Sequence, residues 1–148
     1  MSRARIYLPV DTDDLRALHD GASLPPPRAA HAVTSALRAS LPGADLEELE
    51  YAALLAAAGA ARRARGQTAG RRVVVAADVA TGTIRPADAT EGTGPTDGRS
   101  DVGLTAPLGL RDVASFHADE QPGGGDEDLL WFDVSELGAL LDWLGPCA

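Results

Sequence analysis

A run of apolar residues near the middle of the chain constrains the fold more than any other feature. Residues 72–79 contain Val73-Val74-Val75-Ala76-Ala77, five apolar side chains with no polar residue among them. Successive side chains of a strand point to opposite faces of a sheet, so a strand without alternation is buried on both faces. The sequence therefore predicts a central strand that other elements cover on each side.

Shorter segments on either side of this strand carry signals of further strands and helices. Runs of β-branched, aromatic and aliphatic residues predict strands at 5–10, 30–34, 102–105, 113–118 and 129–132. Capping residues predict helices at about 12–20, 35–41, 45–65 and 133–144. The strands at 102–105 and 113–118 are expected to pair antiparallel across a short turn.

The longest predicted helix begins at a capping box formed by Asp45 and Glu48. It carries two apolar stripes, which predicts that it is covered on two sides. The members of the two stripes are Leu46, Leu49, Ala53, Ala57 and Ala60 in the first, and Tyr51, Leu54, Leu55 and Ala58 in the second.

These elements predict one α+β domain over residues 1–148. We expect a mixed sheet of five to six strands, packed by the long central helix and by the C-terminal helix. Two segments rich in glycine and polar residues, 88–103 and 119–128, are predicted to be flexible loops.

The net charge of −9 comes entirely from the C-terminal quarter. Residues 1–111 hold 13 acidic and 13 basic side chains, whereas residues 112–148 hold nine acidic and no basic ones. This acidity argues against nucleic-acid binding, which depends on clustered cations. The sequence has neither a signal-peptide core nor an apolar run long enough to cross a membrane, so we expect a cytoplasmic protein. The oligomeric state stays open.

Common catalytic and cofactor motifs are missing. The chain has no phosphate-binding loop, no dinucleotide-binding glycine pattern, no hydrolase serine elbow and no zinc-ligand spacing. No metal and no cofactor is therefore predicted. His31 and His117 each fall on a predicted strand, where they are either hydrogen-bonded sheet residues or, if those strands are neighbours, a converging pair.

Arginines and tryptophans provide the remaining candidate sites. One dense basic cluster either stabilises a helix end, binds an anionic ligand, or contacts the acidic C-terminal quarter. Trp131 and Trp143 are expected in the core, unless they are exposed and mark a partner-binding face. The arginines of the cluster are Arg62, Arg63, Arg65, Arg71 and Arg72.

Several segments together resemble a family of small actinobacterial proteins that is a domain of unknown function. They are Ile6-Tyr7-Leu8-Pro9, Ala32-Val33-Thr34, Leu49 to Leu55, Val73 to Val79, Val113 to His117 and Leu130-Trp131-Phe132. The resemblance covers nearly the whole chain and implies no particular activity.

A second resemblance concerns organisation only. A strand with Tyr7, a helix ended by glycine and a strand ending in Thr34 are similar to the first half of ADP-ribosyltransferase domains. That similarity implies an NAD-binding cleft around Tyr7, His31, Thr34 and His117. Leu8 stands where the family has His or Arg, and the nearest counterparts of its catalytic Glu are Asp119 and Glu120.

Two functions are therefore considered. The first is a non-enzymatic interaction or regulatory module that meets a protein partner through its acidic C-terminal quarter and its tryptophans. The second is a diverged ADP-ribosyltransferase-like or nucleotide-binding enzyme, with NAD as its cofactor. The enzyme hypothesis requires the four cleft residues to converge, and the interaction hypothesis requires an exposed apolar patch at Trp131 or Trp143.

Overall fold

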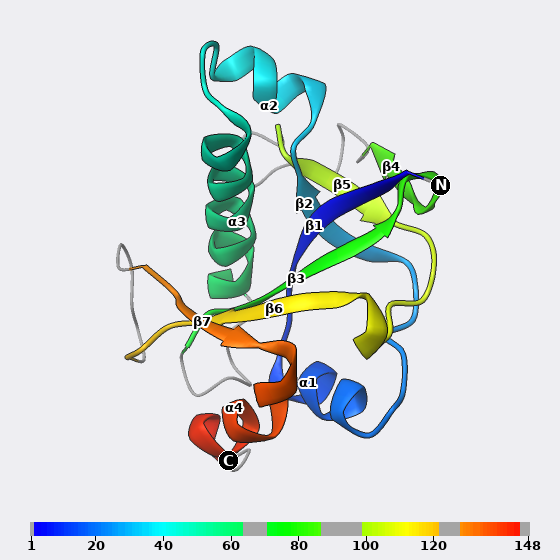
Figure 1. The fold of residues 1–148 in the computed structure, drawn as a ribbon, viewed down its shortest axis with the longest axis vertical. Coiled ribbons are helices and arrows are strands. Elements are labelled where there is room, and N and C mark those ends of the chain that lie inside the picture. The colour runs from blue at the N-terminus through cyan, green and yellow to red at the C-terminus, as the bar shows by residue number, and fades with distance from the viewer. Residues whose placement is uncertain (1, 64–70, 87–98, 122–127, 146–148) are drawn as a thin grey trace.

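The computed structural model describes residues 2–63, 71–86, 99–121 and 128–145. They form an α+β domain in which a curled seven-stranded sheet has helices on both faces (Figure 1). The strands are β1 (Arg3–Pro9), β2 (Arg28–Ala32), β3 (Val73–Ala80), β4 (Ile84–Pro86), β5 (Asp101–Leu104), β6 (Val113–Ala118) and β7 (Leu130–Asp133). The helices are α1 (Thr12–His19), α2 (Ser35–Ser40), α3 (Leu46–Arg63) and α4 (Leu137–Leu144).

The predicted central strand is confirmed as β3. The sheet order is β4-β5-β2-β1-β3-β6-β7, so β3 lies inside the sheet between β1 and β6. Each of the residues 73–77 is at most 1% exposed. The valine run is therefore covered on both faces, as its lack of alternation predicts.

Alternate side chains of β3 enter two separate cores. Val73 and Val75 face the larger core, which α1 and α4 close. Val74 and Ala76 face the smaller core, which lies under α3. In the larger core the two helices contribute Leu15, Leu18, Leu137, Leu140 and Leu144. The sequence predicts that the long central helix and the C-terminal helix pack on the sheet, and in the structure α1 packs on it as well.

α3 packs on the sheet through one face only. Asp45 and Glu48 form the expected capping box, since each carboxylate accepts a backbone N–H of the other residue. Ala53 and Ala57 are fully buried against the sheet. Tyr51 and Leu55 of the second stripe are exposed, so the prediction that α3 is covered on two sides is wrong for these side chains.

The short helices begin at the predicted capping residues. Asp11 forms a capping box with Asp14 at the start of α1, and the Thr34 side chain accepts the N–H of Leu37 in α2. Asp133 caps a 3-10 turn over Val134–Glu136, which leads into α4. No helix among the described residues combines the length and the apolarity that crossing a membrane needs.

Three predictions about the sheet are wrong. Every strand pair in the described part of the chain is antiparallel, whereas the sequence predicts a mixed sheet, and this part forms seven strands instead of five to six. β5 and β6 do not pair with each other, because β2, β1 and β3 lie between them.

The link between β5 and β6 crosses those three strands. Four inter-strand spacings amount to about 19 Å, and eight extended residues reach about 26 Å, so residues 105–112 are long enough. Leu108 anchors the link: it is fully buried and exchanges two backbone hydrogen bonds with Leu24, at 2.8 and 3.0 Å. A link tethered across the sheet in this way cannot act as a hairpin turn.

The predicted loops lie mostly outside the described residues. Of the segment 88–103, residues 101–103 belong to β5, and 88–98 lie outside the described part. Of the segment 119–128, residues 122–127 lie outside it as well.

Replacing Phe116 by alanine should destabilise the fold strongly. Its side chain is fully buried in the larger core, so Phe116→Ala is expected to lower the free energy of unfolding by about 3–5 kcal/mol. Leu46→Ala is the control, because Leu46 is exposed and its loss should change stability by less than about 0.5 kcal/mol. Urea unfolding measures both, and equal losses would contradict the placement of Phe116.

Candidate functional site

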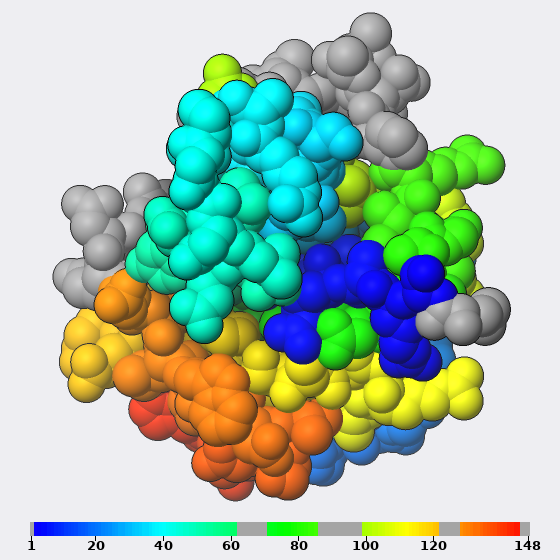
Figure 2. Space-filling model, turned by 45° about the horizontal axis from the view of Figure 1, so that its top comes forward, coloured from blue at the N-terminus to red at the C-terminus, as the bar shows by residue number. Residues whose placement is uncertain are grey.

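α3 covers only part of its sheet face. Beyond it, β1, β3, β6 and β7 reach the surface side by side (Figure 2). There Arg5 of β1 binds the carboxylate of Asp78 on β3 through two N–H groups, at 2.6 and 3.0 Å. These hydrogen bonds hold the pKa of Asp78 below its usual value. Both side chains are more than one third exposed, so the interaction is a surface ion pair.

Ser115 and His117 form a hydrogen-bonded pair on the same face of β6. Their Oγ and Nε2 atoms are 2.9 Å apart. Burial, and then the positive charge of Arg5, lower the pKa of His117, which leaves the imidazole neutral at pH 7. A neutral imidazole beside a hydroxyl can accept its proton, but Ser115 is only 5% exposed. We therefore interpret His117 as the hydrogen-bond partner that the buried hydroxyl of Ser115 needs.

Tyr7 and His31 are brought together by the sheet. They lie directly opposite each other on β1 and β2, and both are buried. Burial raises the pKa of Tyr7. The Nδ1 atom of His31 is 3.0 Å from Ser100 Oγ and 3.2 Å from Asp101 Oδ1, so the imidazole is held against the start of β5. His31 is thus a hydrogen-bonded sheet residue.

The other two cleft candidates do not join this pair. Thr34 follows β2, where its hydroxyl donates to the carbonyl of Arg99 and accepts the N–H of Leu37. His117 lies on β6, three strand positions from His31 on β2. These two histidines do not share a site, because their strands are not neighbours.

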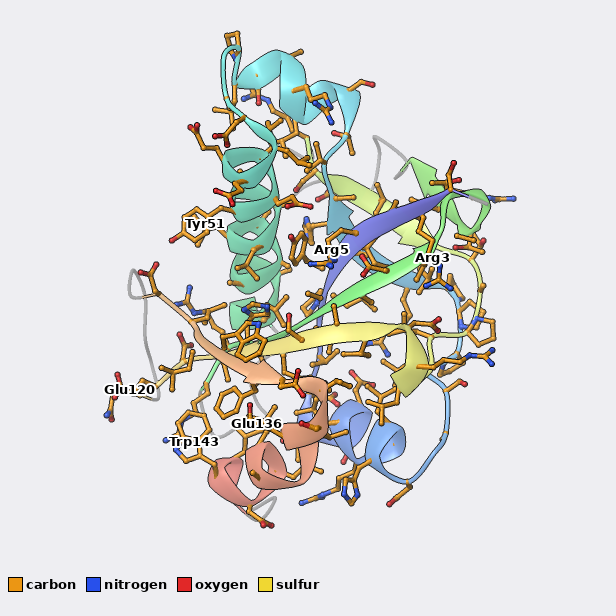
Figure 3. The ribbon with its side chains drawn as sticks, viewed as in Figure 1. Arg3, Arg5, Tyr51, Glu120, Glu136 and Trp143 are labelled. Atoms are coloured by element: carbon orange, nitrogen blue, oxygen red, sulfur yellow. The ribbon has the colours of Figure 1, made fainter. Side chains whose placement is uncertain are left out.

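The residues at the other positions that the transferase resemblance implies also lie away from Tyr7. Leu8 is fully buried in the larger core, on the opposite side of β1 from Tyr7. Asp119 is buried and bound to Arg72. Glu120 is exposed and reaches outward past the end of β6 (Figure 3). None of these side chains faces Tyr7.

The arginine cluster contacts the acidic C-terminal quarter. Arg72 is 5% exposed, and its guanidinium and backbone N–H bind both carboxylate oxygens of Asp119 at 2.7–3.1 Å. Arg71 stacks on the indole of Trp143, 4.4 Å from the ring centroid. Of the three predicted possibilities, the contact with the acidic quarter therefore applies to Arg72. The side chains of Arg62 and Arg63, and all of Arg65, lie outside the described residues.

The two tryptophans differ in exposure. Trp143 of α4 is 36% exposed and packs against Phe132, with ring centroids 5.6 Å apart, as well as under Arg71. Trp131 of β7 is 61% exposed, on the sheet face that α3 partly covers. Exposure is the property expected of a partner-binding tryptophan, and Trp131 is therefore the better candidate of the two.

Exposed side chains of α3 lie on the same side of the sheet as Trp131. Tyr51 points away from the sheet (Figure 3), and its hydroxyl donates to Asp128 Oδ1 at 2.7 Å, which ties α3 to the segment before β7. Leu55 follows one turn later and is 43% exposed. We call Tyr51, Leu55 and Trp131 the Trp131 surface. The sequence signal for Tyr51 and Leu55 was the second stripe of α3, interpreted as buried.

A metal site does not emerge from the described part of the chain. It contains no group of three or more His, Cys, Asp or Glu side chains that could hold an ion.

Comparison with protein families gives one match, to the Family of unknown function (DUF6912), over residues 4–123. The chain belongs to this family. Comparison with curated proteins and with solved structures found no match.

The DUF6912 match and the candidate surface overlap only in part. The matched residues include Tyr51 and Leu55 of α3, as well as the Ser115 and His117 pair. β7 and α4, which carry Trp131 and Trp143, follow the matched region in this DUF6912 member.

Breaking the Arg72–Asp119 pair should cost far more stability than breaking the exposed pair. Asp119→Ala leaves a buried guanidinium without its carboxylate, so we expect a loss of about 3–5 kcal/mol. Asp78→Ala is the matched control and should cost about 1 kcal/mol or less, since Arg5 remains hydrated. Urea unfolding compares the two, and a smaller loss for Asp119→Ala would be inconsistent with its burial.

His117 should titrate below the usual histidine range of about 6.5. Between its lowered pKa and about 6.5 the unfolded chain binds more protons than the folded one, so stability falls as pH decreases through that window. His117→Gln should flatten this dependence. NMR titration gives the pKa directly, and Arg5→Gln should raise it only part of the way, because burial is the larger cause. A wild-type midpoint at or above 6.5 would contradict this account.

Proposed function

We propose that this protein is a cytoplasmic, non-enzymatic interaction module that binds another protein through the Trp131 surface. The observation that carries the proposal is the 61% exposure of Trp131 on a regular strand. Its neighbour Phe132 packs against the larger core, so the strand itself is firmly placed while its tryptophan faces solvent.

The chemistry of the surface supports a protein partner. A large exposed aromatic side chain gains free energy when a partner covers it, and tryptophan and tyrosine are enriched among the residues that dominate binding energy. Tyr51 and Leu55 add apolar area on the same side of the sheet. The hydrogen bond between Tyr51 and Asp128 orders the α3 part of the surface before a partner arrives.

The enzyme hypothesis remains as an alternative, supported by one observation. Tyr7 and His31 are neighbours on β1 and β2, as an NAD-binding cleft of the ADP-ribosyltransferase kind would require. Thr34 and His117 are engaged elsewhere, and Leu8 cannot hydrogen-bond a cofactor from inside the core. The interaction module is therefore the better-supported function.

An actinobacterial origin is consistent with a chain in which all 13 basic residues are arginine.

Two measurements together test the proposal. A thermal-shift series with NAD, other nucleotides and divalent metal ions should be flat, whereas a ligand at a hundredfold excess over its Kd would add about 2.7 kcal/mol. Site-specific photo-crosslinking from position 55 in source cells should yield a discrete protein adduct. Trp131→Ala should abolish the adduct, and Leu46→Ala, which removes another side chain that is more than half exposed, should leave it intact.

Stabilisation by NAD that is lost in Tyr7→Phe would favour the enzyme instead. Adducts that persist in Trp131→Ala would show that the partner binds elsewhere, and no adduct together with a flat series would reject the module as stated.

A further inference from the structure

We propose that the outer edge of β7 binds an extended, arginine-bearing segment of a partner protein as an additional antiparallel strand, with an arginine side chain over Trp131. This inference rests on the proposed function and names the chemistry of the partner. It is argued from the pairing of β7, the charge around it and the aromatic contacts already present in the molecule.

The backbone pairing of β6 determines which groups of β7 face outward. The N–H of Asp119 donates to the carbonyl of Arg72 at 3.0 Å, on the β3 side of β6. Backbone groups alternate in direction along a strand, so Phe116 points its own N–H and C=O toward β7. Phe116 is paired with Phe132, and Trp131 is the next residue of β7. The N–H and C=O of Trp131 therefore point away from β6.

A second hydrogen bond leads to the same result. The N–H of Asp133 donates to Glu136 Oε1 at 2.8 Å instead of to β6. Asp133 and Trp131 are two residues apart, so their backbone groups point in the same direction. An incoming antiparallel strand can thus exchange both hydrogen bonds of a residue pair with Trp131.

The two edges of the sheet differ in their protection. β4 is only three residues long and contains Arg85 and Pro86, and short length, charge and proline all discourage an added strand. β7 contains neither a basic residue nor a proline, and it exposes Leu130 and Trp131. Among the described residues, no strand pairs with its outer edge. β7 is accordingly the open edge.

The charge around β7 selects a cationic partner. Residues 112–148 hold nine acidic and no basic side chains, and Asp128, Asp133 and Glu136 lie within or next to β7. Hydrogen bonds from the Ser135 hydroxyl and then from backbone N–H groups lower the pKa of Asp133, so it stays ionised. A second copy of the chain would bring the same acidity to the edge, which disfavours self-association there.

The molecule already contains the two contacts that such a partner would make. Arg71 stacks on Trp143 at 4.4 Å, and Arg72 binds Asp119 through its guanidinium. Both arginines precede β3, and both meet groups of the acidic quarter. Trp131 is the more exposed of the two tryptophans, so its indole is accessible to the same kind of cation.

A peptide of alternating arginine and valine tests the inference. In a strand paired with β7, the arginines would lie on the Trp131 face and the valines on the Leu130 face. We expect fluorescence anisotropy to detect binding to the full chain, with weaker affinity at higher salt. Trp131→Ala should weaken binding about tenfold or more, whereas Leu46→Ala should leave it unchanged.

Two altered peptides separate the components of the proposal. Replacing the arginines by glutamates should abolish binding, and N-methylation of the residues that pair with Trp131 should weaken it about tenfold or more, since it removes the donor of the added strand. Equal binding of the glutamate peptide would overturn the cationic partner. Equal binding of the methylated peptide would overturn strand addition.

Further outcomes distinguish this inference from the proposed function. If the arginine–valine peptide does not bind, the inference is overturned, while a crosslinked adduct that depends on Trp131 would keep the interaction module. A dimer of the chain alone that disappears in Trp131→Ala, measured by sedimentation, would place a second copy at the edge and overturn the inference as well.

Discussion

The burial of β3 on both faces determines the arrangement of the other elements. Val73 and Val75 require a cover on one face, which α1 and α4 supply, and Val74 and Ala76 require one on the other, which α3 supplies. Four of the eight buried residues of the smaller core are alanines, and α3 packs on the sheet through three of them, Ala53, Ala57 and Ala58. No described element covers the opposite side of α3 at Tyr51 and Leu55, which are exposed.

The ion pair between Arg72 and Asp119 completes this arrangement at one end. It joins the residue before β3 to the residue after β6, and it is almost fully buried. Burying two charges is costly unless each is well paired, and this pair meets the condition with hydrogen bonds from the guanidinium and from the backbone. The start of β3 is thus tied to the acidic quarter, whose β7 carries the proposed binding edge.

Local signals predicted individual elements well. Capping residues such as Asp11, Thr34 and Asp45 set the starts of helices through hydrogen bonds within one turn, which the sequence contains in full. Strand neighbours depend on contacts between distant residues, so the order of β5 and β6 could not be read from the short turn that seems to join them in sequence. Trp131 was a candidate, but its exposure follows from the edge position of β7, which no local pattern encodes. Tyr51 was assigned to a buried stripe, because apolar spacing does not reveal whether a second covering element exists.

The sheet order has a consequence for how the chain assembles during translation. β1 lies at the centre of the sheet, and its two neighbours are β2 and β3. The other edge of β3 pairs with β6. Only β2 is made soon after β1, and the residues of β6 emerge from the ribosome about a hundred residues after those of β1. Until β3 and β6 are made, the sheet lacks the strands on one side of β1, so the complete sheet forms late, through contacts of long sequence separation.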